Sequence, residues 1–209
     1  MDIKICGIKN EETLLCCEEN KVNYFGMIFY SKSPRNISIE QAKKLQEISS
    51  HLNIEGVGVF VDKDINTLRD FIIELKLKYV QLHGKENNSY IKQLKNLGTK
   101  IIKKISINNI KDLSKLDYYS ETDFFLFDYK PNKKELPGGN AKSFDWDIVK
   151  NLEINKPWFL SGGVNINNIQ LIKSQIKPFG VDLSSGVEKE LGIKDNHIIN
   201  KFMSEFSNA

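Results

Sequence analysis

The hydrophobic positions of this chain gather in eight short runs, each separated from the next by a stretch of mixed polarity. The runs are apolar with little alternation, which is typical of parallel strands that are covered on both faces. They predict strands over Ile3–Cys6, Tyr24–Phe29, Gly56–Phe60, Tyr79–Leu82, Lys100–Ile105, Phe124–Asp128, Trp158–Leu160 and Gly180–Leu183.

The stretches between these runs carry helical periodicity. Within residues 65–76, 167–176 and 197–206, apolar side chains recur every three or four positions and would share one face of a helix. Strand and helix therefore alternate along the chain.

Four polar residues mark where helices are expected to begin. Ser38 is followed three residues later by Gln41, which is the spacing of a capping box. Asn10, Ser143 and Asn165 also stand before helical segments, where a side-chain oxygen accepts a hydrogen bond from a free backbone amide. We therefore expect helices to start at these four places.

Strict alternation of strand and helix predicts a parallel sheet, and eight such units predict a single (β/α)8 TIM barrel over residues 1–209. An open, doubly wound sheet with fewer strands is the alternative. The first strand is not followed by the GxGxxG turn of a dinucleotide-binding fold, which favours the barrel. No linker rich in proline, glycine or serine divides the chain, so we expect one domain.

The charged residues argue against a nucleic-acid partner. The formal net charge is only +3, and acidic and basic residues are interleaved along the chain, whereas a nucleic-acid footprint needs a basic stripe. The pairs Lys103-Lys104 and Lys133-Lys134 are too short to form one, and we expect these lysines to be solvated.

Hydropathy and cysteine usage favour a cytoplasmic protein. No apolar stretch is long enough to span a membrane, and the N-terminus has no signal-peptide pattern. The three cysteines are Cys6, Cys16 and Cys17, an odd number that makes a poor disulfide framework. No cysteine or histidine pair has zinc-ligand spacing, so we expect no metal, and we expect Cys16 and Cys17 to be structural.

Chemically active residues follow the predicted strands, where the active site of such a barrel forms. Cys6 ends the first strand and Asp128 ends the sixth, and a thiolate base facing a protonated carboxyl implies a proton-shifting isomerisation. Arg35 follows the second strand and suits either a two-point grip on a carboxylate or a surface salt bridge. Asp62 is expected to be structural, and His83 to orient a loop.

The segments after the seventh and eighth strands predict a phosphate site. They read Ser-Gly-Gly and Asp-Leu-Ser-Ser-Gly, and glycines let the backbone approach an anion closely. The loops in these two places are the usual phosphate cradle of the barrel. The residues expected to hold phosphate are Gly162, Gly163, Ser184, Ser185 and Gly186.

Eight motifs in order, from Lys4 to the last helix, resemble those of the phosphoribosylanthranilate isomerases of tryptophan biosynthesis. They are KICGI, SPRNIS, GVFVD, QLHG, FDYK, LPGGNAKSFDW, LSGGVNINNI and GVDLSSGVEKELGIKD. The resemblance implies an Amadori rearrangement of N-(5-phospho-β-D-ribosyl)anthranilate to 1-(2-carboxyphenylamino)-1-deoxy-D-ribulose 5-phosphate. It implies that no cofactor is needed, because the aminoaldose itself supplies the imine.

The resemblance also assigns roles to single residues. Asp128 would protonate the ribose ring oxygen, and Cys6 would remove the proton from carbon two of the sugar. Arg35 would bind the anthranilate carboxylate, and Asp182 would hold a ribose hydroxyl. The one departure is the stretch 138–141, Gly-Gly-Asn-Ala, where the family usually has Gly-Gly-Thr-Gly.

Other readings of the site remain open from the sequence. A pentose-phosphate epimerase would need a metal site that three scattered histidines do not supply. The next enzyme of the same pathway would need lysines and glutamates at the strand ends. A non-catalytic or differently specific phosphate-binding barrel is the remaining alternative. The sequence also leaves open whether the protein is a monomer or a homodimer, and whether it accepts the related aminoaldose of histidine biosynthesis.

Overall fold

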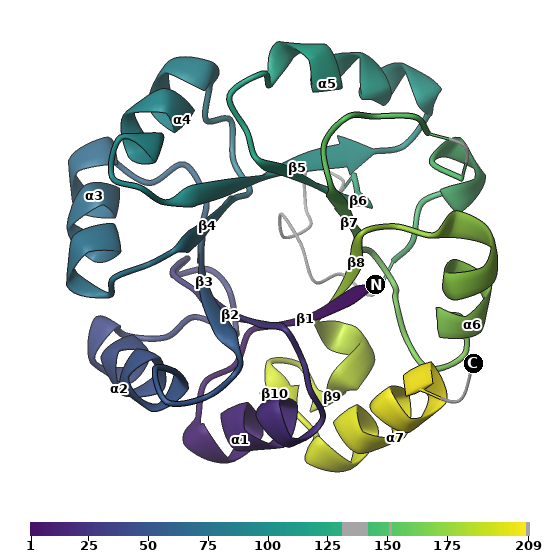
Figure 1. The fold of residues 1–209 in the computed structure, drawn as a ribbon, viewed down its shortest axis with the longest axis horizontal. Helices are drawn as coiled ribbons and strands as arrows, with labels where there is room; N and C mark the ends of the chain where they lie inside the picture. The colour runs from purple at the N-terminus through teal and green to yellow at the C-terminus, as the bar shows by residue number, and fades with distance from the viewer. Residues whose placement is uncertain (131–141, 151, 208–209) are drawn as a thin grey trace.

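Eight parallel strands close into a ring in which each strand pairs with its sequence neighbours and β1 pairs with β8 (Figure 1). This is a computed structural model, and it describes residues 1–130, 142–150 and 152–207. The strands are β1 Asp2–Cys6, β2 Tyr24–Ile28, β3 Glu55–Phe60, β4 Tyr79–Leu82, β5 Lys100–Ile107, β6 Phe124–Tyr129, β7 Trp158–Leu160 and β8 Gly180–Leu183. The predicted (β/α)8 barrel is confirmed.

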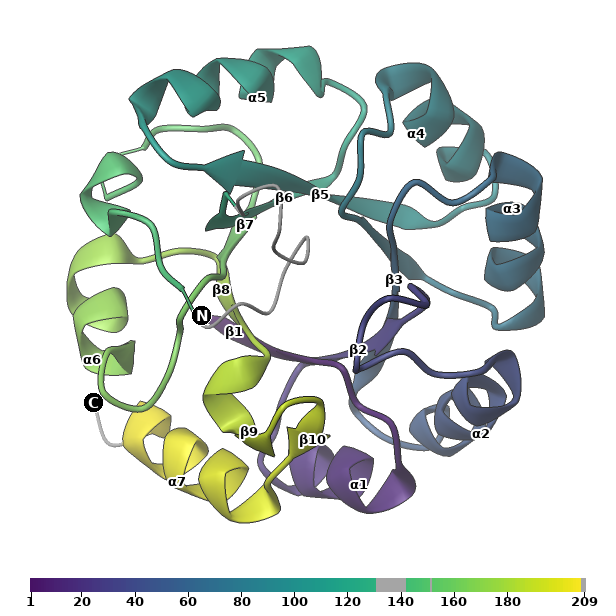
Figure 2. The same cartoon turned by 180° about the vertical axis from the view of Figure 1, so that it is seen from behind.

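The helices form an outer ring around the strands, as both views along the barrel show (Figures 1 and 2). In the part of the chain that the structure describes, no helix is both long enough and apolar enough to span a membrane. The helices are α1 Glu11–Glu19, α2 Ile39–Ser49, α3 Ile65–Glu74, α4 Asn88–Lys95, α5 Lys115–Tyr118, α6 Ile169–Leu171 and α7 Asn196–Ser207.

Short elements complete the connections between strands and helices. Figure 2 shows the small hairpin of β9 and β10 between the end of β8 and helix α7. These elements are the helical turns η1 Ile110–Ser114, η2 Trp146–Ile148, η3 Ile172–Ile176 and η4 Ser185–Val187, and the strands β9 Glu188–Glu190 and β10 Ile193–Lys194.

Two of the four predicted helix caps are confirmed. The Ser38 hydroxyl accepts a hydrogen bond from the Gln41 amide, and the Gln41 side chain accepts one from the Ser38 amide, so a capping box begins α2. The Asn10 side chain accepts from the Thr13 amide and caps α1. In both places the side chain satisfies a backbone donor that the first helical turn leaves free.

The other two cap predictions are wrong. Asp145, not Ser143, caps the helical turn η2. The Asn165 side chain accepts a hydrogen bond from the Asn167 amide and closes a tight turn, and α6 begins only at Ile169. Asparagine favours such local turns as readily as a helix cap, and the sequence does not distinguish the two.

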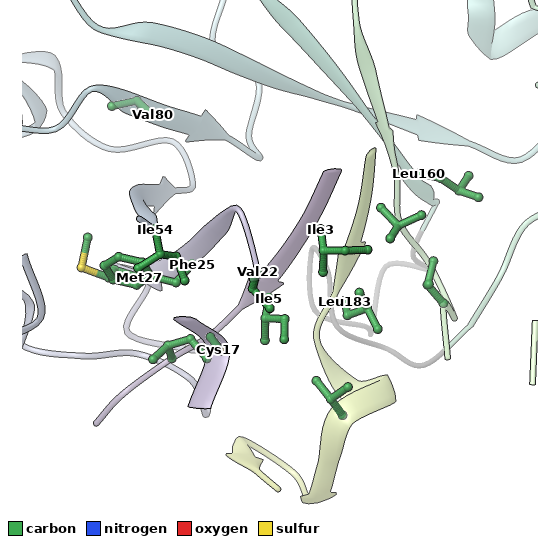
Figure 3. Close-up of a cluster of buried hydrophobic side chains, with 14 of the residues drawn as sticks. Ile3, Ile5, Cys17, Val22, Phe25, Met27, Ile54, Val80, Leu160 and Leu183 are labelled. Carbon is green, nitrogen blue, oxygen red and sulfur yellow. The ribbon is translucent and has the colours of Figure 1, made fainter. Parts of the chain in front are cut away.

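The period of two along each strand divides its side chains between the helices and the barrel interior. On β1, Ile3 and Ile5 pack in the core between strands and helices, where Figure 3 shows them near Leu183 of β8. The interior is filled by a separate cluster, made of Cys6, Tyr24, Val57, Val59, Ile102, Leu126 and Phe159. Each fully buried apolar side chain contributes about 1.5–3 kcal/mol of transfer free energy.

The expectation that Lys103 and Lys104 are solvated is wrong. They are 1% and 6% exposed because β5 is covered on both faces. Neighbouring strand residues point to opposite faces, so each lysine has its own acidic partner. Lys103 Nζ lies 2.7 Å from Glu86 Oε2, and Lys104 Nζ lies 3.6 Å from Asp128 Oδ2. The pair 133–134 lies outside the described residues.

Candidate active site

The candidate site lies at the carboxyl end of the barrel. Cys6 is the last residue of β1, Asp128 lies near the end of β6, and Asp182 lies near the end of β8. Because β7 and β8 separate β6 from β1 in the ring, Asp182 lies between the other two. Asp128 and Asp182 line one pocket with Ser184, whose hydroxyl donates to the Cys6 carbonyl, so the three residues share one site.

Lys4 supplies a buried positive charge beneath this site. Its side chain is fully buried, and its Nζ lies 2.9 Å from Asp182 Oδ1. Burial alone would lower the pKa of Lys4, but the negative charges of Asp182 and Cys6 raise it above its ordinary value. Lys4 therefore remains an ammonium inside the barrel.

The Cys6 thiol lies in a mixed electrostatic environment. Burial raises its pKa, and the nearby Lys4 and Lys194 charges oppose that rise. A thiolate is the form that accepts protons. The pKa stays above its ordinary value because burial outweighs the two lysines, so Lys4 and Lys194 reduce the cost of forming the thiolate that a base requires.

The Asp128 carboxyl is held by both of its oxygens. Oδ1 accepts a hydrogen bond of 2.9 Å from the Tyr129 backbone amide, and Oδ2 faces Lys104. Burial raises the pKa of Asp128, although Lys104 opposes the rise. The carboxyl consequently keeps its proton to a higher pH than an exposed aspartate does, as an acid catalyst requires.

The five residues predicted to hold phosphate line one pocket with Asp128, Asp182 and Lys142. Gly162 and Gly163 adopt φ angles of +83° and +78°, which side chains other than glycine rarely adopt. These glycines turn the backbone after β7 toward the pocket. The five predicted residues are Gly162, Gly163, Ser184, Ser185 and Gly186.

Arg35 lies in a buried ion pair. Its Nε is 2.7 Å from Glu188 Oε1, and its Nη2 is 2.8 Å from Glu188 Oε2. The alternative of a surface salt bridge is wrong, because Arg35 is only 1% exposed. The two parallel bonds fix the plane of the guanidinium.

Sequence reasoning missed the lysines of the site. Lys4 precedes Cys6 by two positions and so faces the same side of β1. Lys104, with Lys103, interrupts the apolar run of β5 although both are buried. A lysine inside an otherwise apolar strand run is the signal that could have found both, and for Lys4 the position two residues before Cys6 adds to it. The partners Glu188 and Lys194 carry no comparable local signal.

Asp62 and His83 occupy the loops expected of them. Asp62 Oδ1 accepts a 2.6 Å hydrogen bond from the Lys85 amide and so ties the loop after β3 to the loop after β4. His83 Nε2 contacts the Gln81 side chain. These contacts fit a structural role for both.

The described ranges contain no cluster of three or more histidine, cysteine or acidic side chains that could hold a metal ion. The stretch 138–141, where the sequence departs from the family pattern, lies outside the described residues.

The fold and this site define a single-barrel protein with its ligand site at the carboxyl ends of the strands. Residues 3–205 match the family model described as N-(5'phosphoribosyl)anthranilate (PRA) isomerase. The chain belongs to this family and is an enzyme.

Individual relatives agree with the family match. The chain is 38% identical over 203 residues to the N-(5'-phosphoribosyl)anthranilate isomerase of Clostridium acetobutylicum, covering 96% of this chain and 95% of the relative. It is 39% identical over 204 residues to that of Agrobacterium fabrum, covering 96% and 92%.

Solved structures agree as well. The phosphoribosyl anthranilate isomerase of Thermotoga maritima superposes with a TM-score of 0.88 at 31% identity, covering all of both chains. A phosphoribosyl anthranilate isomerase in complex with reduced 1-(o-carboxyphenylamino)-1-deoxyribulose 5-phosphate superposes with a TM-score of 0.83 at 30% identity, again covering all of both chains.

Proposed function

We propose that this chain isomerises N-(5-phospho-β-D-ribosyl)anthranilate to 1-(2-carboxyphenylamino)-1-deoxy-D-ribulose 5-phosphate in tryptophan biosynthesis. Family membership supports the reaction class, and the related complex with a reduced product supports the substrate class. The observation that carries the proposal is that Cys6 and Asp128 lie at the same end of the ring, on either side of Asp182.

Asp128 is the proposed general acid. Burial raises its pKa and so favours the protonated carboxyl; that proton goes to the ribose ring oxygen, which opens the ring to a Schiff base. The carboxylate that remains lies 3.6 Å from the Lys104 ammonium. That positive charge stabilises the product of the proton transfer.

Cys6 is the proposed general base. The thiolate takes the proton from carbon two of the open sugar, and the electron pair moves toward the imine to give an enamine. The enol hydroxyl then loses a proton while carbon one gains one. The proton that Cys6 takes balances the one that Asp128 gives, so the rearrangement consumes no proton overall. Lys4 supports the thiolate that starts this step.

The remaining residues bind the substrate. The glycine and serine loops after β7 and β8 would hold the phosphate, and Arg35 would bind the anthranilate carboxylate. Asp182, whose Oδ1 is held by Lys4, would hold a ribose hydroxyl. The substrate's own imine serves as the electron sink, so the mechanism uses no cofactor.

The proposal is tested by following the loss of phosphoribosylanthranilate fluorescence with purified protein. We expect turnover in the wild type, and a fall in kcat of roughly 10²–10⁴-fold in both Cys6→Ser and Asp128→Asn, because each loses a proton-transfer group. Cys16→Ser and Asp147→Asn serve as matched controls, since both residues lie outside the site, and they should keep wild-type turnover.

The outcomes separate the reaction from the roles. A wild type without turnover contradicts the proposed function, whereas full activity in either variant contradicts only the role of that residue. The same assay with the aminoaldose of histidine biosynthesis decides whether the site accepts both substrates.

A further inference from the structure

Glu188 places one buried carboxylate between two cations of the site. It is the first residue of β9, which follows β8 through the turn η4, and its side chain is 4% exposed. Glu188 Oε1 lies 2.7 Å from Arg35 Nε and 2.6 Å from Lys194 Nζ, while Oε2 lies 2.8 Å from Arg35 Nη2. Arg35 and Lys194 both bind this one carboxylate, so Glu188 fixes the positions of the two side chains relative to each other.

The network continues from Lys194 into the phosphate loop. Lys194 Nζ donates to the Ser184 carbonyl at 3.0 Å and to Ser184 Oγ at 3.3 Å. The Ser184 hydroxyl in turn donates to the Cys6 carbonyl at 3.1 Å. An unbroken chain of contacts therefore runs from Arg35 to the end of β1.

The backbone reinforces the same connection. Gly192, in the turn between β9 and β10, adopts φ +83°, and a Cβ atom there would lie 2.8 Å from the Pro34 carbonyl oxygen. The Gly192 amide also donates to Glu188 Oε2 at 3.2 Å. The hairpin thus packs directly against the loop that carries Arg35.

The positions of Arg35 and Lys194 depend on the negative charge of Glu188. Burial opposes ionisation of Glu188, but hydrogen bonds and charge from Arg35 and Lys194 lower its pKa to about 2. Without the carboxylate, Arg35 and Lys194 would lose the negative charge that both contact, and loss of one partner from a buried ion pair is strongly destabilising. Both cations would then leave the positions that the network gives them.

We infer that Glu188 is a positioning residue that sets Arg35 and Ser184 at the same time, and so fixes both ends of the substrate site from one carboxylate. The inference rests on the proposed function for what the two ends bind: an aromatic carboxylate at Arg35 and a phosphate at Ser184. Glu188 does not line the pocket that contains Ser184, so it would act through Arg35 and Ser184.

The test measures binding at the two ends separately, by calorimetric titration of inorganic phosphate and of anthranilate into the full-length protein. We expect Glu188→Gln to weaken both ligands by roughly 10–100-fold, the loss typical of a charge-assisted hydrogen-bond network. Lys194→Met should weaken phosphate alone, because Arg35 keeps its bonds to Glu188. Glu74→Gln, at an exposed ion pair with Lys43, is the control and should change neither.

Steady-state kinetics add a readout that a general loss of stability does not give. Glu188→Gln should raise KM more than it lowers kcat, because Lys4 still faces Cys6 and Lys104 still faces Asp128, and only the Lys194 part of the charge that favours the thiolate is displaced. Weakening of only one ligand, or of neither, overturns the inference. If Glu188→Gln does not fold, Glu188→Asp and Lys194→Met are compared instead. Equal weakening of phosphate and anthranilate binding in Lys194→Met then overturns the inference.

The two proposals fail in different ways. If the wild type binds phosphate and anthranilate but does not isomerise the substrate, the proposed function fails. The two calorimetric titrations still test the role of Glu188. If Glu188→Gln binds both ligands as the wild type does and turnover is normal, only the positioning role is lost.

Discussion

At the residue scale, each proposed proton-transfer group has a lysine of its own inside the barrel. Lys4 lies beside Cys6 and Asp182, and Lys104 lies beside Asp128. A buried ammonium favours the anionic form of its neighbour. The base therefore has help in becoming a thiolate, and the acid has a counter-charge once its proton has left.

Lys4→Met is expected to raise the pKa of the Cys6 thiol, because the charge that opposes the effect of burial is removed. It should also lower the free energy of unfolding by about 3–5 kcal/mol, since Asp182 loses its buried partner. The measurement is the pH dependence of thiolate ultraviolet absorbance, taken as the difference between each protein and the same protein carrying Cys6→Ser.

Lys104→Met is the matched control for this titration. It removes an equally buried lysine that contacts Asp128 and not Cys6, so the thiolate titration should stay where it is in the wild type. If the Cys6 pKa shifts equally in both variants, the loss of any buried lysine in the barrel has this effect. Lys4 would then have no particular influence on Cys6.

At the element scale, the loops after β7 and β8 shape the proposed phosphate pocket with little help from helices. The helix after β7 begins only at Ile169, beyond the turn at Gly162 and Gly163, and continues into η3, and only a helical turn follows β8. The close approach of backbone to ligand therefore depends on the glycines themselves.

Gly162→Ala is expected to weaken phosphate binding, whereas Gly98→Ala should not. Both glycines have positive φ, and both variants should lose about 1–2 kcal/mol of stability from backbone strain. A Cβ at Gly162 would lie 3.1 Å from Asp128 Oδ1 and from two backbone atoms of the pocket, while one at Gly98 would meet nothing within 4 Å. Calorimetric titration with inorganic phosphate distinguishes the two, and equal affinities would exclude Gly162 from the cradle.

At the scale of the whole molecule, buried ion pairs join segments that are far apart in the sequence. Lys4 and Asp182 are 178 positions apart, and Arg35 and Glu188 are 153 positions apart. Both pairs link the first strands of the barrel to its last strand and the hairpin after it, so they add to the closure of the ring. Such pairs make stability depend on pH.

Acid should remove the contribution of Glu188 to stability. Its pKa is lowered in the folded protein from an ordinary value of 4.5 to about 2, so its stabilising effect is complete above pH 4.5 and disappears as the pH falls toward 2. The effect is on the order of 3 kcal/mol. Urea unfolding across this range should show the gap between wild type and Glu188→Gln narrowing as the solution becomes more acidic. A gap that stays constant would contradict the lowered pKa.

The local patterns of the sequence predicted most of the fold. The eight apolar runs match the eight strands to within two residues at each end, and the Ser38 and Asn10 caps are confirmed. Strand pairing order followed from strict alternation. The misplaced caps at Ser143 and Asn165 failed because a short polar side chain serves a turn as well as a helix start.

The sequence by itself determined the ring of strands and which end of it carries Cys6, Asp128 and Asp182, because periodicity and strand order are local properties of the chain. Only the tertiary structure decided which charges meet: that Lys4 lies under Asp182, that Lys103 and Lys104 are buried, and that Glu188 holds Arg35. Those partners are brought together by closure of the barrel. A buried charge is tolerated where an opposite charge happens to face it, and no short stretch of sequence contains that information.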